Sequence, residues 1–265
     1  MTKKTRVLGI GLLAVLMGGQ TMQANHSWGN YHWQRSANPL LLDVGDNVSN
    51  AWDTYLDGAI ADWNVSTVLT LSEVAGGANP RNCRPTTGRI EVCNSRYGQN
   101  GWLGLAQIWV SGDHITQATT KVNDTYFNMP QYDTPAWRRL VMCQEVAHDF
   151  GLDHQDETFD NPNLGSCMDY TNDPDGGPGG ASNNDPSNEH PNQHDYDQLV
   201  TIYSHLDGAG GGNPNGQSRP EEVPAQLDRG QFGRLVRSTN GGRTELYELD
   251  LGFGRKVFTH VIWAE

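Results

Sequence analysis

The sequence has few basic residues for its length. Its 265 residues include 18 Lys and Arg but 31 Asp and Glu, which gives a formal net charge of −13 at pH 7. Binding to the phosphates of nucleic acid requires the opposite charge, so we do not expect nucleic acid as a partner. An acidic chain is compatible with bound cations such as Ca²⁺.

Long hydrophobic segments are also scarce. The run VLGIGLLAVLMGG (7–19) follows basic residues at 3–6 and precedes a small-residue cleavage site at 22–24. This pattern predicts a signal peptide over 1–24, since the run is too short to span a bilayer comfortably. The mature chain would begin at Asn25, with a net charge of −16, and would be secreted or periplasmic, without a membrane partner after cleavage.

The chain contains only four cysteines, Cys83, Cys93, Cys143 and Cys167. In an exported protein they allow two disulfides in three connectivities. Cys83 and Cys93 flank the segment CRPTTGRIEVC and can close a small loop, so we favour the pairs 83–93 and 143–167. Zinc binding by thiolates is the alternative, but the spacing and the oxidising compartment are wrong for it.

Hydrophobic periodicity predicts an α+β domain over residues 25–207. Apolar residues have helical spacing in three segments, at 51–64, 135–151 and 192–206. Short apolar or alternating runs predict strands at 68–74, 88–97, 104–110 and 114–124. The order of helix, strands, helix, loop and helix is typical of α+β or α/β domains.

The C-terminal part has a different composition. Residues 208–227 begin with GAGGGNPNGQ and are rich in Gly and Pro, which predicts a flexible linker. Residues 228–265 contain the strand-like runs GRLVRS, TELYELDL and KVFTHVIW, with a turn signal at 240–242. We therefore expect a small β-rich C-terminal appendage.

The segment QEVAHDFGLDH carries the candidate chemistry. On a helix, Gln144 and His148 are one turn apart on the same face, and Glu145 lies beside that face. Gly151 permits a sharp turn that returns His154 to the same point. Zinc binds a few N, O or S ligands and leaves a position for water, which a neighbouring acid can deprotonate. Four matching positions favour a metal site over two solvated or capping histidines.

These residues resemble the metzincin clan of zinc endopeptidases, whose helix has the consensus HExxHxxGxxHxxD. Downstream, GSCMDY (165–170) is similar to the clan's Met-turn, with Met168 supporting the site from below without binding metal. The resemblance spans about 31–206 and is matrixin-like. It implies a twisted mixed sheet with three main helices. It also implies that 104–110 is an edge strand that pairs with a peptide substrate, through Gly104, Leu105, Ala106 and Gln107.

The sequence departs from the clan at the first ligand, where Gln144 replaces histidine. A neutral amide oxygen is a weaker donor for zinc than imidazole. Gln144 could still bind the ion beside His148 and His154, another residue could replace it, or the metal could be lost. Tyr170 is the best substitute, because astacins and serralysins have a zinc-binding tyrosine two residues after the Met-turn methionine. An ordinary packing tyrosine is the alternative.

Several other polar residues have weaker signals. If His154 points inward, Asp153 should point away, whereas Asp156 and Glu157 would support the ligands from behind or cap the loop. The segment Asp173-Pro174-Asp175-Gly176 offers oxygen ligands for Ca²⁺, or is a solvated acidic loop. We interpret the histidines near the last helix as surface residues; they are His190, His194 and His205.

The sequence therefore predicts a secreted, monomeric zinc endopeptidase that acts on a peptide or protein substrate. Glu145 would be the general base toward a zinc-activated water, and would then protonate the leaving amine. The alternative is a catalytically inactive metzincin-fold protein that binds a peptide or protein.

Overall fold

The computed structural model describes residues 26–178, 184–208 and 229–264. The signal peptide predicted for 1–24 and nearly all of the linker predicted for 208–227 lie outside these residues. No helix within the described part is long and apolar enough to cross a membrane.

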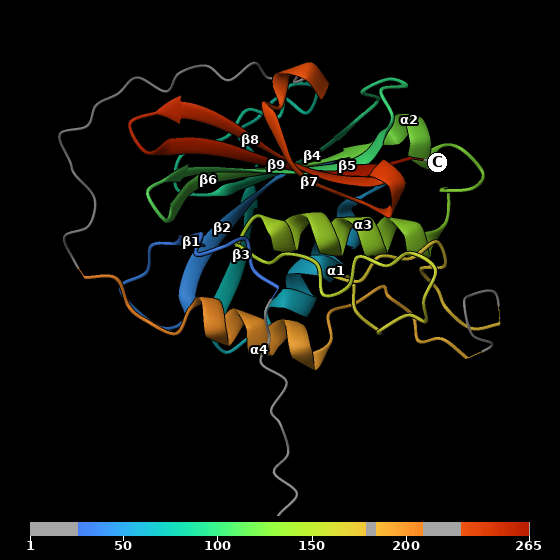
Figure 1. Cartoon of the computed structure of the whole chain (residues 1–265), viewed down its shortest axis with the longest axis horizontal. Helices are drawn as coiled ribbons and strands as arrows, with labels where there is room; N and C mark the ends of the chain where they lie inside the picture. The colour runs from blue at the N-terminus through green and yellow to red at the C-terminus, as the bar shows by residue number, and fades with distance from the viewer. Residues whose placement is uncertain (1–25, 179–183, 209–228, 265) are drawn as a thin grey trace, which may run out of the picture.

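A mixed sheet, with nine strands in the described residues, organises the molecule (Figure 1). The strands are β1 (His32–Trp33), β2 (Leu40–Asn47), β3 (Leu69–Ala75), β4 (Ile90–Ser95), β5 (Trp102–Ser111), β6 (His114–Asn123), β7 (Arg234–Thr239), β8 (Thr244–Gly252) and β9 (Arg255–Trp263). Their order is β3-β2-β4-β6-β5-β9-β8-β7, and β1 also pairs with β6. Strands β2, β3, β4 and β6 pair in parallel, whereas β5, β9, β8 and β7 add antiparallel pairs.

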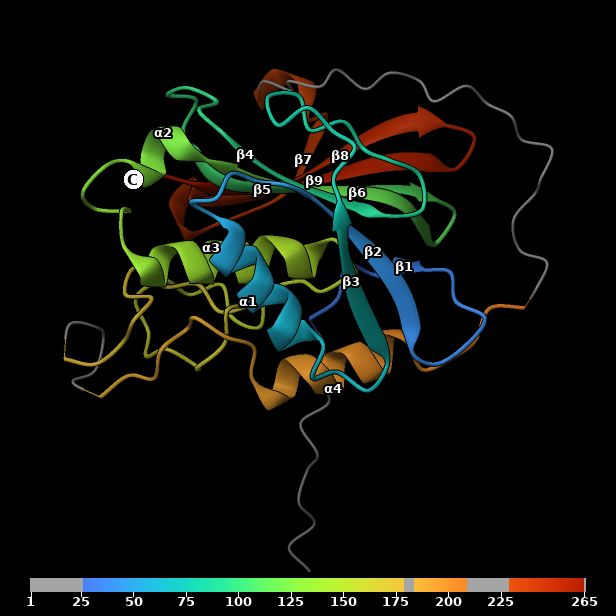
Figure 2. The ribbon, with the colours of Figure 1, turned by 180° about the vertical axis from the view of Figure 1, so that it is seen from behind.

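Three main helices lie on one side of the sheet, as the two opposite views show (Figures 1 and 2). They are α1 (Asp53–Trp63), α3 (Pro135–His148) and α4 (Gln193–Ile202), and a single-turn helix, α2 (Asp124–Phe127), follows β6. The inner face of α1 buries four apolar side chains, Leu56, Ala59, Ile60 and Trp63. Each large buried side chain contributes about 1.5–3 kcal/mol. The α+β fold with a twisted mixed sheet is as predicted.

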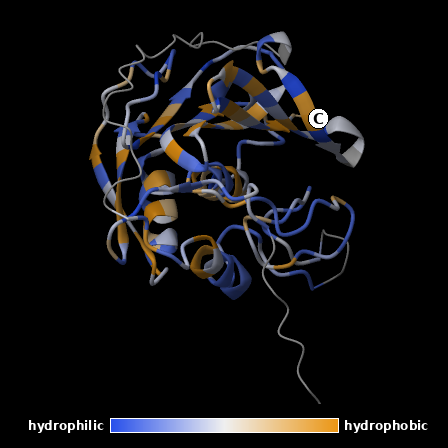
Figure 3. Cartoon of the chain, turned by 60° about the vertical axis from the view of Figure 1, so that its left-hand side comes forward, coloured by the Kyte–Doolittle hydropathy of each residue, from blue (hydrophilic) through white to orange (hydrophobic). Residues whose placement is uncertain are grey.

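The C-terminal segment is β-rich, as predicted, but its strands continue the central sheet. Strand β9 pairs with β5, β8 pairs with β9, and β7 pairs with β8. Short 3₁₀ turns, η1 (Arg229–Gln231) and η2 (Asn240–Gly242), precede and follow β7. In Figure 3, hydrophobic segments gather in the sheet and the helices beneath it, whereas the chain between α3 and α4 is largely hydrophilic.

The prediction that 104–110 forms an edge strand is wrong. Strand β5 pairs with β6 on one side and with β9 on the other, where Gly104 faces Ile262 and Gln107 faces Thr259. The apolar residues of KVFTHVIW form this second partner because they bury Val257, Phe258, Val261 and Ile262. A peptide could pair with Gly104, Leu105, Ala106 and Gln107 only if β9 left this place.

Both predicted disulfides are confirmed. Cys83 is bonded to Cys93 in β4, and Cys143 in α3 is bonded to Cys167, which precedes Met168. These bonds use all four cysteines, so thiolate binding of zinc is excluded. The second bond attaches the helix of the candidate metal site to the predicted Met-turn.

Candidate metal centre

Helix α3 and the turn after it position the first candidate ligands. The helix begins at a cap in which the Thr134 side chain accepts a hydrogen bond from the Trp137 backbone, with Pro135 in the first turn. After α3 ends at His148, Gly151 has φ +100°, and a Cβ there would lie 2.6 Å from the Tyr31 carbonyl oxygen. Only glycine fits this turn, which redirects the chain toward His154.

The structure brings His148 and His154 together, with their Nε2 atoms 3.0 Å apart. The Nδ1 atom of His148 lies 2.8 Å from the Leu152 carbonyl oxygen, so Nδ1 carries the hydrogen and Nε2 presents a lone pair. The Nδ1 atom of His154 lies 3.5 Å from carboxylate oxygens of Asp153 and Glu157. The two Nε2 atoms face each other, joined either by a hydrogen on one of them or by a cation that binds both lone pairs.

A third imidazole, from His260 in β9, completes this group. Its ring centroid is 4.2 Å from that of His148 and 4.4 Å from that of His154. One nitrogen from each of the three rings lies within 4.8 Å of the others. Burial lowers the pKa of His148 and of His260 well below the usual value, so both rings are neutral, as metal ligands must be.

Sequence reasoning missed His260. It occurs outside the motif, in a segment that we expected to be an appendage. The only local signal is a histidine at an inward position of the apolar strand sequence KVFTHVIW. The pairing of β9 with β5 places His260 opposite Ala106 and brings it to the helix.

The structure also brings Tyr170 to the centre. Its hydroxyl oxygen lies 3.1 Å from His260 Nε2, and its ring centroid is 4.1 Å from that of His154. Tyr170 is 3% exposed, and burial raises the pKa of its hydroxyl well above the usual value. A bound cation would act in the opposite direction and favour the phenolate.

Gln144 lies one turn before His148 on α3 and is buried. Its Nε2 atom donates a hydrogen bond to the Cys167 carbonyl at 2.8 Å, which fixes the amide. Its Oε1 atom is buried and has no hydrogen-bond partner. A buried acceptor without a donor is costly, and a cation would satisfy it.

Glu145 is fully buried against the sheet. Neither of its carboxyl oxygens has a hydrogen-bond partner, and a Cβ at Gly104 would lie 2.6 Å from Oε1. Burial, with a smaller effect of nearby Asp149, raises the pKa of Glu145 well above the usual value. Burial thus favours the protonated form of this carboxyl group, a perturbation typical of groups that transfer protons at functional sites.

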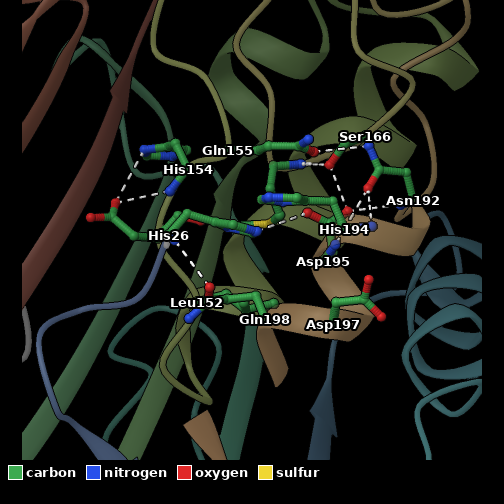
Figure 4. A network of polar contacts seen from close by, with 12 residues as sticks. His26, Leu152, His154, Gln155, Ser166, Asn192, His194, Asp195, Asp197 and Gln198 are labelled. Atoms are coloured by element: carbon green, nitrogen blue, oxygen red, sulfur yellow. Dashed lines mark hydrogen bonds and ion pairs between the residues drawn. The ribbon is translucent and has the colours of Figure 1, made fainter. Parts of the chain in front are cut away.

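The turn that contains Met168 is held from two directions. The Met168 backbone N–H donates to Ser166 Oγ at 2.9 Å, and Ser166 Oγ donates to Asp195 Oδ2 at 2.7 Å. The Gln155 backbone N–H donates to the Met168 carbonyl at 2.6 Å. Figure 4 shows this network beside His154, with Ser166 and Asp195 pointing toward each other. The turn is thus attached both to α4 and to the segment after His154.

Arg237 of β7 ties the C-terminal strands to the loop that carries His154. Its guanidinium donates to both Asp153 oxygens, at 2.5 and 2.7 Å, and lies 3.0 Å from Glu157 Oε1. Burial acts to raise the pKa of Asp153, but the hydrogen bonds from Arg237 lower it below the usual value. Arg237 thus holds Asp153 on the Nδ1 side of the His154 ring, opposite the Nε2 atom that faces His148.

A cavity of about 200 Å³ opens beside this centre. Gln144 and Tyr170 are among the residues that line it, and Trp137, Leu140 and Trp263 contribute apolar walls. The predicted Ca²⁺ segment lies elsewhere; there, Asp173 has neighbouring acids in Asp175 and Asp185, and calcium binding stays a prediction.

The donors at the centre fit zinc. Three imidazoles, with an amide oxygen and a phenol nearby, form the nitrogen-rich set that Zn²⁺ prefers over Ca²⁺ or Mg²⁺. A bound cation could also satisfy the buried Gln144 oxygen, which has no hydrogen-bond partner, and the closely spaced Nε2 atoms of His148 and His154.

No protein-family model matches the chain, and a search of curated proteins found no match. Two solved structures are similar in part. High choriolytic enzyme 1, a hatching-enzyme zinc-protease from the medaka fish Oryzias latipes, has 12% identity and a TM-score of 0.36, covering 68% of this chain and 98% of that one. Myroilysin has 12% identity and a TM-score of 0.36, covering 66% and 97%. At this similarity neither structure assigns a family or an activity to the chain.

Proposed function

We propose that the chain is an exported, metzincin-like zinc endopeptidase whose metal ligands are His148, His154 and His260. The observation that carries this proposal is the convergence of three buried imidazoles, two of which, His148 and His154, belong with Glu145 to a segment that has the spacing of a zinc-peptidase helix. His260 supplies the imidazole that the motif lacks, which explains why Gln144 is tolerated.

Bound zinc would act as a Lewis acid, polarising a peptide carbonyl and lowering the pKa of a water molecule. Glu145 is the only acid of the motif whose carboxyl is buried without hydrogen-bond partners among the described residues. It takes the proton of the attacking water and delivers it to the leaving nitrogen of the peptide bond. Gln144 Oε1 and the Tyr170 hydroxyl flank the ligands and can bind the ion or the carbonyl oxygen.

The cavity beside the centre has the lining expected of a pocket that binds an apolar side chain of the substrate. Tyr132, Trp137, Leu140 and Trp263 form its walls, and apolar walls of this kind bind by burial of hydrophobic surface. Since β9 already pairs with β5, the substrate would enter from this cavity rather than by strand pairing with Gly104–Gln107.

A second candidate function is a zinc-binding protein without peptidase activity. The burial of the centre favours it, because Glu145 and His148 have no exposed surface and His260 is 1% exposed. Strand β9 would then fill the place of a peptide beside β5, and Tyr170 would close the fourth position of the ion. Structural zinc sites are closed in this manner.

Zinc content and peptide cleavage separate these functions. We would measure both for the full chain, Glu145→Ala, His260→Ala and the control His190→Ala, whose side chain is 60% exposed. The zinc of this centre is identified as the ion lost in His154→Ala. If the chain is a peptidase, Glu145→Ala should keep this zinc but cleave peptides about 100-fold more slowly than the wild type. His260→Ala binds this zinc more weakly and cleaves more slowly, and His190→Ala changes neither.

Other outcomes contradict the proposal. If the wild type keeps this zinc but cleaves none of a broad peptide library, the second candidate function is correct. If His260→Ala cleaves faster than the wild type, β9 is an inhibitory occupant rather than a ligand-bearing strand. If His154→Ala and the wild type bind equal amounts of zinc, the centre is not a zinc site.

A further inference from the structure

A second cluster of histidines lies on residues that the proposed peptidase does not use. His32 begins β1, His114 begins β6, and His205 and Asp207 follow α4. The three Nε2 atoms face one carboxylate oxygen, Asp207 Oδ1, at 3.5 Å for His32 and at 3.3 Å for His114 and His205. His205, which we expected to be a surface histidine, thus belongs to a cluster although its side chain is 53% exposed.

The backbone holds these four residues in place. His32 and His114 are directly opposite each other in the parallel pair of β1 and β6, with ring centroids 4.9 Å apart. Asp207 is fixed by Arg35: the Arg35 backbone N–H donates to Asp207 Oδ2, and the Asp207 N–H donates to the Arg35 carbonyl, both at 2.8 Å. The Arg35 Nε–H also donates to the His205 carbonyl at 3.0 Å.

The distances in the cluster are longer than those of strong charge-assisted hydrogen bonds and are compatible with a shared ion. Charge-assisted N–H···O bonds measure about 2.7–2.9 Å, whereas all three distances to Asp207 Oδ1 are 3.3 Å or more. Tetrahedral zinc with bonds of about 2.0–2.2 Å would place its ligand atoms about 3.3–3.5 Å from one another. One atom each from His32, His114 and Asp207 also lies within 4.8 Å of the others.

The orientation of His32 points independently to a cation. Its Nδ1 atom lies 2.7 Å from the Asn30 carbonyl oxygen, which can only accept, so Nδ1 carries the hydrogen of the neutral ring. Its Nε2 atom is buried, has no hydrogen-bond partner, and presents a lone pair toward a carboxylate oxygen. A cation between these two atoms would interact favourably with both of them.

We propose that His32, His114 and Asp207 hold a second divalent ion of the zinc class, with His205, which lies outside this close group but 3.3 Å from Asp207 Oδ1, as a further donor. Imidazoles with one carboxylate form a donor set that suits Zn²⁺, whereas Ca²⁺ and Mg²⁺ require oxygen ligands. When His205 also binds, no coordination position remains open, as in structural zinc sites. The ion joins β1, β6 and the end of α4, three segments that are distant in the sequence.

Zinc stoichiometry of the full chain tests this site separately from the first centre. With Zn²⁺ as the only added metal, native mass spectrometry should find two ions in the wild type and in His190→Ala. It should find one in Asp207→Asn and one in His154→Ala, and none when these two substitutions are combined. The count in His154→Ala does not depend on peptidase activity, so this inference can hold even if the proposed function fails.

The exposed ligand His205 provides a variant that should fold normally. In the His154→Ala background, His205→Ala should weaken zinc binding at least tenfold and remove the rise in melting temperature that Zn²⁺ produces. If Asp207→Asn binds as many ions as the wild type, or if His205→Ala changes neither affinity nor melting temperature, the proposal is overturned.

Discussion

The Tyr170 hydroxyl and the Nε2 atom of His260 lie 3.1 Å apart, although 90 residues separate them in the sequence. Tyr170 follows the turn of Met168, and His260 is on β9 near the end of the chain. Their contact makes the last strand part of the candidate metal centre. The C-terminal segment is therefore required for the ligand set, and is not an accessory to a site completed elsewhere.

The position of Gln144 predicts that a histidine at residue 144 can replace His260 as a zinc ligand. His260→Ala should weaken zinc binding, because an amide oxygen is a poorer donor than imidazole. Adding Gln144→His to this variant should raise its zinc affinity at least tenfold. Competition with a chromogenic chelator, in the Asp207→Asn background, would measure this. If the double variant binds zinc as weakly as His260→Ala, position 144 does not face the ion.

Arg237→Gln should loosen the contact between β7 and the loop of His154. It removes hydrogen bonds to Asp153 and the ion pair with Glu157, and we expect a loss of about 1–2 kcal/mol in the free energy of unfolding. Arg234→Gln is the matched control, because Arg234 is 70% exposed and lies 3.5 Å from Glu248. Urea denaturation should show less than about 0.5 kcal/mol for the control. Equal losses would show that the Arg237 contact has no special importance.

Replacing each disulfide by two serines should separate stability from metal binding. Loss of either the 83–93 or the 143–167 bond is expected to cost about 2–4 kcal/mol, since each closes a loop in the unfolded chain. Only loss of the 143–167 bond should also weaken zinc binding at the first centre, because Gln144 is fixed on the Cys167 carbonyl. Unfolding and zinc titrations of both variants would check this, and equal zinc affinities would contradict it.

Lys121 on β6 predicts a specific pH dependence of stability. Burial lowers its pKa from 10.5 to about 8, so between these values the unfolded chain binds more protons than the folded one. The contribution of Lys121 to the free energy of unfolding therefore rises with pH across this window, and its destabilising effect is complete below pH 8. Lys121→Met should be more stable than the wild type below pH 8, by an amount on the order of 3 kcal/mol that shrinks toward pH 10.5. A stability difference that does not change with pH would contradict this assignment.

The sequence determined the local parts of the molecule. A helical repeat and a turning glycine are short-range properties, so the meeting of His148 with His154 beside Glu145 followed from their spacing. The same holds for the strand and helix positions, for the small 83–93 loop, and for the 143–167 pair that it left by elimination. The interest in Tyr170 came from its spacing to Met168, and the structure then placed it beside two imidazoles.

The tertiary structure decided which distant segments meet. The pattern of KVFTHVIW predicts a strand but cannot name its partner, so the pairing of β9 with β5 and the arrival of His260 were not predictable. The cluster around Asp207 has the same origin, because the pairing of β1 with β6 and the contacts of Arg35 bring together residues 32, 114 and 207. Periodicity reports which face of a segment is apolar. The packing of the whole chain selects the surface that covers that face, and thereby the side chains that share a site.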